Sequence, residues 1–181
     1  MKKMKNIGLT ITAMALSALM LPQALKAQDH KDKIMDDSKE AKSSFVKADP
    51  SMENLFKNAY GYAIFPNIGK GAVGVGGAAG GGTVYERGKA IGTAQMVQVN
   101  VGAQVGGKAY REVVFFENKG ALDRFKNNRI EFDGQASAVA VKSGAGANAN
   151  YREGVVVFSQ EKSGLMLEAS IGGQKFTYKT L

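Results

Sequence analysis

The sequence predicts an α+β fold, with N-terminal helices followed by a strongly twisted, glycine-rich antiparallel β-sheet or partial barrel that carries one short inserted helix. Apolar residues recur at helical spacing before residue 60 and at strand spacing after it. The 181 residues include 23 glycines, roughly double the usual share. The length fits one domain with a sizeable core. We therefore divide the chain into segments 1–27, 28–49 and 50–181.

Segment 1–27 has the parts of an export signal. Lys2, Lys3 and Lys5 form a positive start, residues 7–21 form an apolar run, and Ala27 is a small residue suited to cleavage. The apolar run is shorter than the roughly 20 residues that cross a bilayer, so an uncleaved anchor is the less favoured interpretation. We expect an exported protein in the periplasm or outer envelope of a Gram-negative bacterium.

Cysteine content and net charge exclude several classes of partner and chemistry. The chain has no cysteine, which excludes disulfides, thiolate zinc sites, cysteine nucleophiles and a lipid anchor on an N-terminal cysteine. The formal net charge of +8 falls to +4 when the 4 lysines of segment 1–27 are subtracted. A charge of +4 does not by itself indicate nucleic-acid binding, so no nucleic-acid partner is predicted.

Two helices are expected before residue 60. Residues 29–48 place Ile34, Ala41 and Phe45 on one face and charged side chains on the opposite face. The Asp49–Pro50 pair ends this helix, and Pro50 can open a second one. The apolar stripe of the second helix consists of Met52, Leu55, Phe56 and Ala59.

Eight strand-like runs follow, with a short helix containing Leu122 and Phe125 between the fourth and the fifth. Alternation with one polar face predicts antiparallel pairing. In the third run Val97 lies on the apolar face and Gln98 on the polar face. The runs cover residues 62–65, 83–86, 94–101, 110–116, 137–141, 153–159, 164–171 and 175–179.

Two glycine-rich stretches resemble phosphate-binding loops. Residues 69–74 match G-x-G-x-x-G, and residues 102–108 match G-x-x-x-x-G-K. Both patterns require a helix directly afterwards, whereas the first runs into more glycines and the second into a strand. We expect no nucleotide binding and assign structural roles to the glycines, which allow bulges, coiling or close approach. The glycines assigned in this way are Gly71, Gly74, Gly76, Gly77, Gly80, Gly106 and Gly107.

No catalytic constellation is recognisable, and we predict that the protein is not an enzyme. The only histidine, His30, lies three residues after the predicted cleavage point. Glu86, Glu112 and Glu117 are candidate acids without a partner base, and we interpret them as solvated charges on strand faces. No metal or cofactor is predicted.

The densest positive cluster outside segment 1–27 surrounds the short helix. It suits anionic lipid headgroups, although a solvated helix face is the plainer interpretation. The cluster consists of Lys119, Arg124, Lys126 and Arg129.

The runs "YAIFPNIGKGAVGVGGAAGGGTVYERG", "GAQVGGKAYREVVFFEN" and "LEASIGGQKF" resemble the SYLF domain, also called the DUF500 or actin-regulator-like family, over residues 52–176. The resemblance implies a lipid-binding module, and eukaryotic members bind phosphoinositide-rich membranes, some through an N-terminal amphipathic helix. Bacterial members are exported, so we do not carry actin regulation over to this chain.

The resemblance also implies an alternative membrane contact on the N-terminal helix. Its basic side chains are balanced by acidic ones, so we favour docking of this helix on the core. The alternative contact residues are Lys31, Lys33, Ile34, Lys42 and Phe45. The predicted function is a non-enzymatic module of the cell envelope that binds anionic phospholipid or a membrane surface. The alternative is a protein-interaction or structural envelope protein without a lipid ligand.

Overall fold

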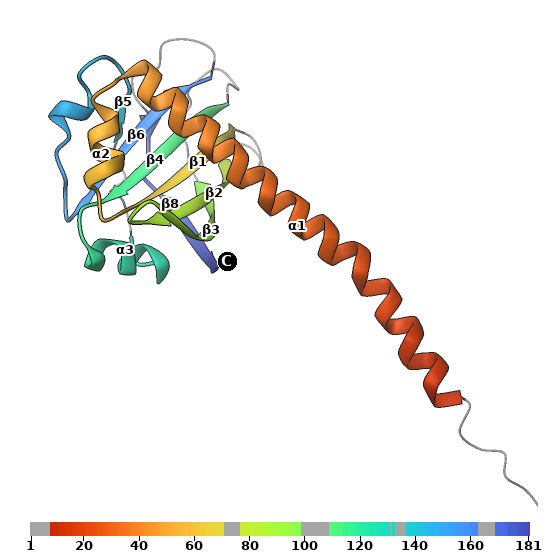
Figure 1. Cartoon of the computed structure of the whole chain (residues 1–181). Helices are drawn as coiled ribbons and strands as arrows, with labels where there is room; N and C mark the ends of the chain where they lie inside the picture. The colour runs from red at the N-terminus through yellow and green to blue at the C-terminus, as the bar shows by residue number, and fades with distance from the viewer. Residues whose placement is uncertain (1–7, 71–76, 99–108, 131, 133–136, 163–168) are drawn as a thin grey trace, which may run out of the picture. The chain divides into compact units, whose positions relative to one another are not determined.

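The computed structural model describes residues 8–70, 77–98, 109–130, 132, 137–162 and 169–181 (Figure 1). The chain divides into two compact units, with the boundary between Lys33 and Ile34. Helix α1 (Gly8–Ala48) crosses this boundary. No helix in the described part of the chain is long and apolar enough to cross a membrane.

The order of elements in the unit that begins at Ile34 confirms the predicted α+β class. Helices α1 and α2 (Met52–Asn58) come first, and α3 (Lys119–Lys126) lies between the fourth and fifth strands. A 3₁₀ turn, η1 (Gly146–Asn148), precedes the sixth strand. The strands are β1 (Gly61–Lys70), β2 (Ala78–Glu86), β3 (Lys89–Gln98), β4 (Tyr110–Phe116), β5 (Ser137–Ala140), β6 (Val155–Glu161), β7 (Ala169–Ser170) and β8 (Gln174–Thr180).

The strands form one sheet in the order β7-β5-β6-β4-β1-β2-β3-β8. Six of the seven pairings are antiparallel, as the alternating patterns predict, while β5 and β6 pair in parallel. β7 and β8 stand at opposite ends of this order, yet only residues 171–173 separate them along the chain. Three residues span roughly 10–14 Å from one strand end to the next, so the sheet must coil until its two edges approach each other.

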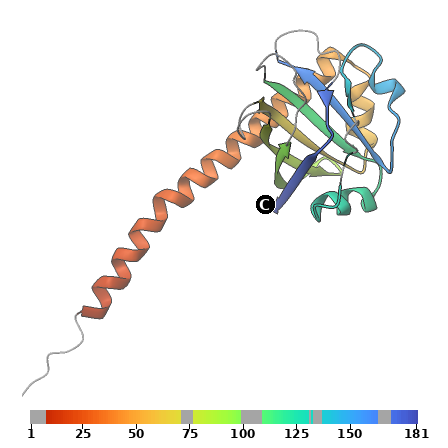
Figure 2. The ribbon, with the colours of Figure 1, turned by 180° about the vertical axis from the view of Figure 1, so that it is seen from behind.

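Contacts between β4 and β8 confirm the coiling. The two strands are four places apart in the sheet, which in a flat sheet would separate them by about 19 Å. Instead Gln174 of β8 donates a hydrogen bond to Glu112 of β4 at 3.0 Å. The Phe125 ring of α3 lies 4.9 Å from the Phe116 ring of β4 and 5.0 Å from the Phe176 ring of β8. Seen from behind, β8 crosses over the other strands (Figure 2).

The coiled sheet buries apolar side chains on both faces. On the inner face, Phe65, Met96 and Phe176 belong to a core that α3 completes with Leu122 and Phe125. The outer face is covered by α2 and by the part of α1 that follows Lys33 (Figure 1). That second core contains Ala41, Phe45, Met52, Phe56, Tyr62, Ile64, Val113, Phe115, Val156 and Phe158.

Three consecutive glycines in β2 allow close packing on both of its faces. A Cβ atom at Gly80 would lie 2.5 Å from the Asn67 carbonyl oxygen, and one at Gly82 would lie 2.5 Å from the Ile64 carbonyl oxygen. A Cβ atom at Gly81 would face the opposite way, 3.0 Å from the Ile34 side chain of α1. The glycines therefore admit the bulged strand β1 on one face and α1 on the other.

Gly80→Ala is expected to lower the free energy of unfolding by about 1–3 kcal/mol, because the added methyl group overlaps backbone that cannot move away. Gly69→Ala is the matched control, since a Cβ atom at Gly69 meets nothing within 4 Å. Urea unfolding of both variants measures the difference. Equal stability of Gly80→Ala and the parent would contradict the packing described for β2.

Candidate functional site

Helix α3 places the predicted basic cluster on the surface at one end of the coiled sheet. The Asn118 side chain caps the helix by accepting a hydrogen bond from the Ala121 backbone N–H at 3.0 Å. Leu122 and Phe125 are buried in the inner core, as their spacing predicts. Because one face of α3 is fixed against the core, the charged side chains of the helix lie on its other faces.

Two lysines of the cluster share one acid. The Lys119 Nζ lies 2.5 Å from Asp123 Oδ2, and the Lys126 Nζ lies 3.9 Å from Asp123 Oδ1. The Lys126 ammonium also sits 5.9 Å from the centre of the Tyr178 ring on β8. These contacts hold the cations in place but neutralise only one positive charge.

The two arginines differ in how they are held. The Arg124 guanidinium donates a hydrogen bond to the Glu153 carbonyl, whereas Arg129 lies exposed just after the helix. We name Lys119, Arg124, Lys126 and Arg129 the basic patch. Asp123 lies among them and the exposed Glu117 lies two residues before Lys119, so the net charge at the patch is +2 (four cations less two acids).

Arg87 also lies at this end of the sheet, a position that the sequence does not predict. Arg87 lies in the turn between β2 and β3 with a φ of 49°, and its guanidinium sits 5.1 Å from the centre of the Tyr60 ring. The Tyr60 hydroxyl donates to Glu86 at 2.7 Å. Lys119 is close enough to both Tyr60 and Glu86 for their charges to affect its pKa. A turn was foreseeable from "ERGK", but its place beside α3 depends on strand pairing.

Three of the five alternative membrane-contact residues lie against the sheet. Phe45 is fully buried in the outer core, and Ile34 approaches Gly81. The Lys42 ammonium sits 5.0 Å from the centre of the Phe56 ring and donates to the Tyr62 hydroxyl at 3.4 Å. This part of α1 thus packs on the sheet, the arrangement that its balanced charges favour.

Other predicted residues fall elsewhere. Lys31 and Lys33 belong to the unit that precedes Ile34, and Lys33 is exposed. Gly77 and Gly80 lie within the structure, and both are at least partly buried. Gly71, Gly74, Gly76, Gly106 and Gly107 lie outside the described residues, as do most residues of the two loops that resemble phosphate-binding motifs.

A polar group occupies the inner face at the end of the sheet away from α3. Glu112 and Ser159 are direct partners on β4 and β6, and Gln174 of β8 donates a hydrogen bond to Glu112. All three side chains are at most 1% exposed. Tyr110, two residues before Glu112 on β4, is buried on the same face.

Glu112 corrects the expectation of a solvated strand-face charge. Burial raises the pKa of Glu112 to about 7, and the hydrogen bond from the Gln174 amide opposes this rise only in part. The expectation was wrong because both faces of β4 are covered, which period-two alternation cannot reveal. By contrast Glu117 is exposed, and Glu86 is half-buried against Tyr60.

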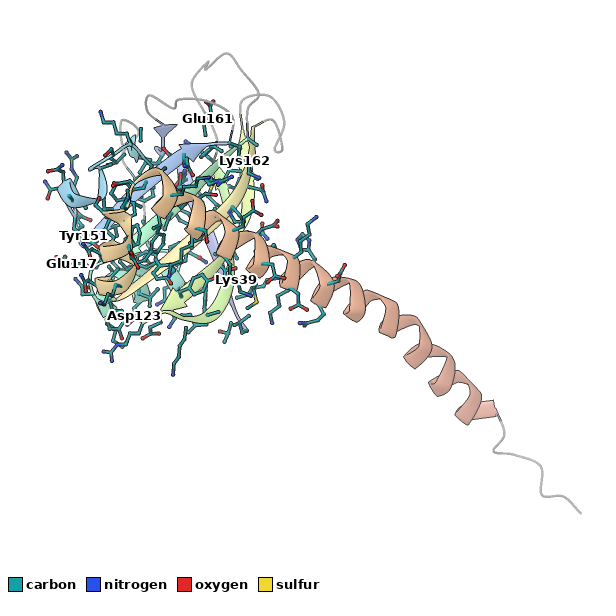
Figure 3. All side chains as sticks on the ribbon, turned by 45° about the horizontal axis from the view of Figure 1, so that its top comes forward. Lys39, Glu117, Asp123, Tyr151, Glu161 and Lys162 are labelled. Carbon is teal, nitrogen blue, oxygen red and sulfur yellow. The ribbon has the colours of Figure 1, made fainter. Side chains whose placement is uncertain are left out.

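A surface cleft of about 370 Å³ lies between α2, η1 and the start of α3. Its polar side chains are those of Ser51, Asn54, Asn58, Glu117 and Tyr151. Figure 3 shows Glu117 and Tyr151 close together at this side of the sheet. Burial and the nearby Glu117 carboxylate raise the pKa of Tyr151.

Asp49 fixes one wall of the cleft. Its carboxylate is 1% exposed and accepts hydrogen bonds from the backbone N–H groups of Ser51 (3.1 Å), Gly144 (3.1 Å) and Gly146 (2.7 Å). The Ser51 hydroxyl donates to it at 2.8 Å. Burial opposes ionisation, but these hydrogen bonds outweigh it and hold the pKa of Asp49 below its usual value. The end of α1 is thereby joined to a loop 97 residues away.

Within the described residues, no group of three or more histidine, cysteine, aspartate or glutamate side chains could hold a metal ion.

Comparison with known proteins identifies the family of the chain. Residues 97–180 match the family described as Ysc84, Las17-binding protein actin regulator. Beta cell expansion factor A of Aeromonas veronii is 33% identical over 128 residues, which cover 70% of this chain and 49% of that relative. The chain belongs to the Ysc84 (SYLF) family.

The match to the SYLF family covers the part of the sheet that bears both polar features. The basic patch, Glu112 and Gln174 all fall within residues 97–180, whereas α1, α2, β1 and β2 precede them. The chain spans about half the length of the curated relative that it matches.

Asp49→Ala is expected to lower the free energy of unfolding at pH 7 by about 2–4 kcal/mol, because several backbone N–H groups lose their acceptor. The pKa of Asp49 is lowered in the folded state, so its contribution is present above the unfolded pKa and is lost as the pH falls through the folded pKa. The difference between Asp49→Ala and the parent should therefore shrink below about pH 4. The free energy of unfolding of Asp49→Asn, which keeps one acceptor oxygen, should lie between those of Asp49→Ala and the parent. Urea unfolding at a series of pH values tests this, and a constant difference would contradict it.

Proposed function

We propose that this SYLF chain is a non-enzymatic module of the bacterial cell envelope that binds anionic phospholipid surfaces weakly and reversibly. The observation that carries the proposal is the basic patch at the α3 end, where four cations surround one acid. The patch is built on a helix whose other face is anchored in the core, so binding requires no rearrangement of the fold.

The size of the charge supports weak binding. Each Lys or Arg near an anionic membrane contributes about a fivefold gain in affinity, so a net charge of +2 contributes about a 25-fold gain. That gain is lost as salt shortens the range of the attraction. Val139 and Leu181 are the exposed large apolar side chains of the described residues, and neither belongs to the patch. Electrostatic attachment without deep insertion is therefore the expected mode.

The N-terminal helix is the weaker candidate for the membrane contact. Ile34, Lys42 and Phe45 are engaged with the sheet, so their use at a membrane would require α1 to leave the outer core. Lys31 and Lys33 remain as a separate contact. A variant that lacks residues 28–33 tests their contribution without disturbing the outer core.

We also propose that segment 1–27 directs export and is removed after Ala27, because its lysines, apolar run and small terminal residue follow the order of an export signal. The mature chain would carry no lipid anchor, since it has no cysteine. Its partner surface would then be a membrane leaflet or envelope lipid that it meets from the aqueous side.

Reversal of two exposed charges in the patch should abolish vesicle binding. Mature protein is expected to co-sediment with vesicles of phosphatidylglycerol and phosphatidylcholine at low salt, and to be released as salt rises. Lys119→Glu with Arg129→Glu should reduce this binding below detection, because attraction at two positions becomes repulsion. Both side chains are exposed, so the melting temperature should stay close to that of the parent.

The matched control is Lys57→Glu with Lys142→Glu, which changes the net charge equally at two exposed positions outside the patch. This control should bind nearly as well as the parent. Equal loss in both double variants would show that net charge and not the patch governs binding. Absence of binding by the parent at low salt would overturn the lipid proposal in favour of a protein-interaction module.

A further inference from the structure

The turn between β2 and β3 carries a residue that its backbone does not favour. The pairing of Glu86 with Lys89 leaves Arg87 and Gly88 as a two-residue loop. Both residues have a positive φ, 49° at Arg87 and 79° at Gly88, as in a type I′ turn. The first position of such a turn favours asparagine, aspartate or glycine, because other side chains crowd the backbone at positive φ. Arginine at this position therefore lowers the stability of the turn.

The fold gains little from the Arg87 side chain in return. The side chain is exposed, and its guanidinium sits 5.1 Å from the centre of the Tyr60 ring. A cation–π contact at an exposed site is weak. Within the described part of the chain, no ion pair joins Arg87 to an acid. A residue that departs from the local preference of its turn without a compensating contact points to a role outside folding.

The turn lies beside α3 and therefore beside the basic patch. The Tyr60 hydroxyl donates a hydrogen bond to Glu86, which raises the pKa of Tyr60, and the charges of Arg87 and Lys119 oppose this rise. Tyr60 is thus close to a cation from the turn and to a cation from α3. The Leu122 side chain of α3 also lies against the first residue of β1, directly after Tyr60. Arg87 and the basic patch consequently belong to one surface.

A second turn of the same kind provides an internal comparison. Glu153 and Gly154 have φ values of 49° and 77°, and the flanking residues Arg152 and Val155 form an antiparallel bridge. This turn borders α3 as well, since the Glu153 carbonyl accepts a hydrogen bond from the Arg124 guanidinium. The two turns place opposite charges on the same backbone conformation. The effect of the backbone can therefore be separated from the effect of the charge.

We propose that the β2–β3 turn is a second membrane contact next to the basic patch, in which the Arg87 guanidinium binds phosphate groups of anionic phospholipids. This contact rests on the lipid binding proposed above and adds a residue to it. A guanidinium suits the contact, because its planar array of donors can pair with two phosphate oxygens at once. The turn contributes a net charge of +1 (Arg87 and Lys89 less Glu86), which adds to the charge of the basic patch.

The test compares the vesicle affinity and the melting temperature of Arg87→Asn with those of the parent. Mature protein is titrated at low salt with vesicles of phosphatidylglycerol and phosphatidylcholine. The affinity of Arg87→Asn should be about fivefold weaker, because one cation is lost at the membrane. Its melting temperature should equal or exceed that of the parent, since asparagine suits a positive φ. Unchanged affinity, or a lower melting temperature that shows the fold itself to need Arg87, would overturn the proposal.

Two control variants separate the backbone and the net charge from the contact. Glu153→Asn makes the same change to the same kind of turn without the loss of a cation, so it should bind at least as well as the parent. Lys57→Gln removes one positive charge from an exposed side chain outside the patch and should bind nearly as well. Weakening in either control as large as that in Arg87→Asn would overturn the proposal. Absence of binding by the parent would instead overturn the lipid binding itself, and the Arg87 contact with it.

Discussion

The approach of β4 and β8 inside the coiled sheet is the constraint on which the other features of the fold depend. Phe125 packs between Phe116 and Phe176, so α3 can be held at one end of the sheet only when the two strands are close. The same approach brings Gln174 to Glu112 at the other end. An open sheet would expose the inner core and separate both sets of contacts. The basic patch and the buried polar group are thus two consequences of one coil.

The outer face uses the apolar side of the N-terminal helix beyond Lys33. Phe45 and Ala41 complete a core with α2 and the middle strands, and Gly81 leaves room for Ile34. Asp49 then joins the end of α1 to the loop around Gly146. Since the apolar face of α1 beyond Lys33 is used inside the protein, the proposed membrane contact is assigned to α3.

The fold class and the buried face of α3 could be predicted because each depends on local periodicity. The end of α1 could be predicted because the Asp49–Pro50 pair stops a helix. The basic patch was also foreseeable, since its four residues lie within one short stretch. The burial of Gln98 could not be predicted. Its alternation with Val97 indicated a polar face, but Gln98 is buried and its amide donates a hydrogen bond to the Gly172 carbonyl. For the same reason, Glu112 was wrongly predicted to be solvated, and the place of Arg87 beside α3 was not predicted. Their surroundings come from strands distant in sequence, and spacing along one strand carries no information about what covers it.

The proximity of β4 and β8 in solution is the sharpest test of the coiled sheet. Nuclear Overhauser effects between aromatic protons can be measured on mature protein with isotope-labelled phenylalanine. Cross-peaks are expected from the Phe125 ring to both Phe116 and Phe176, which belong to strands four places apart in the sheet. Cross-peaks from Phe125 to only one of these rings, in a folded sample, would contradict the coiled sheet.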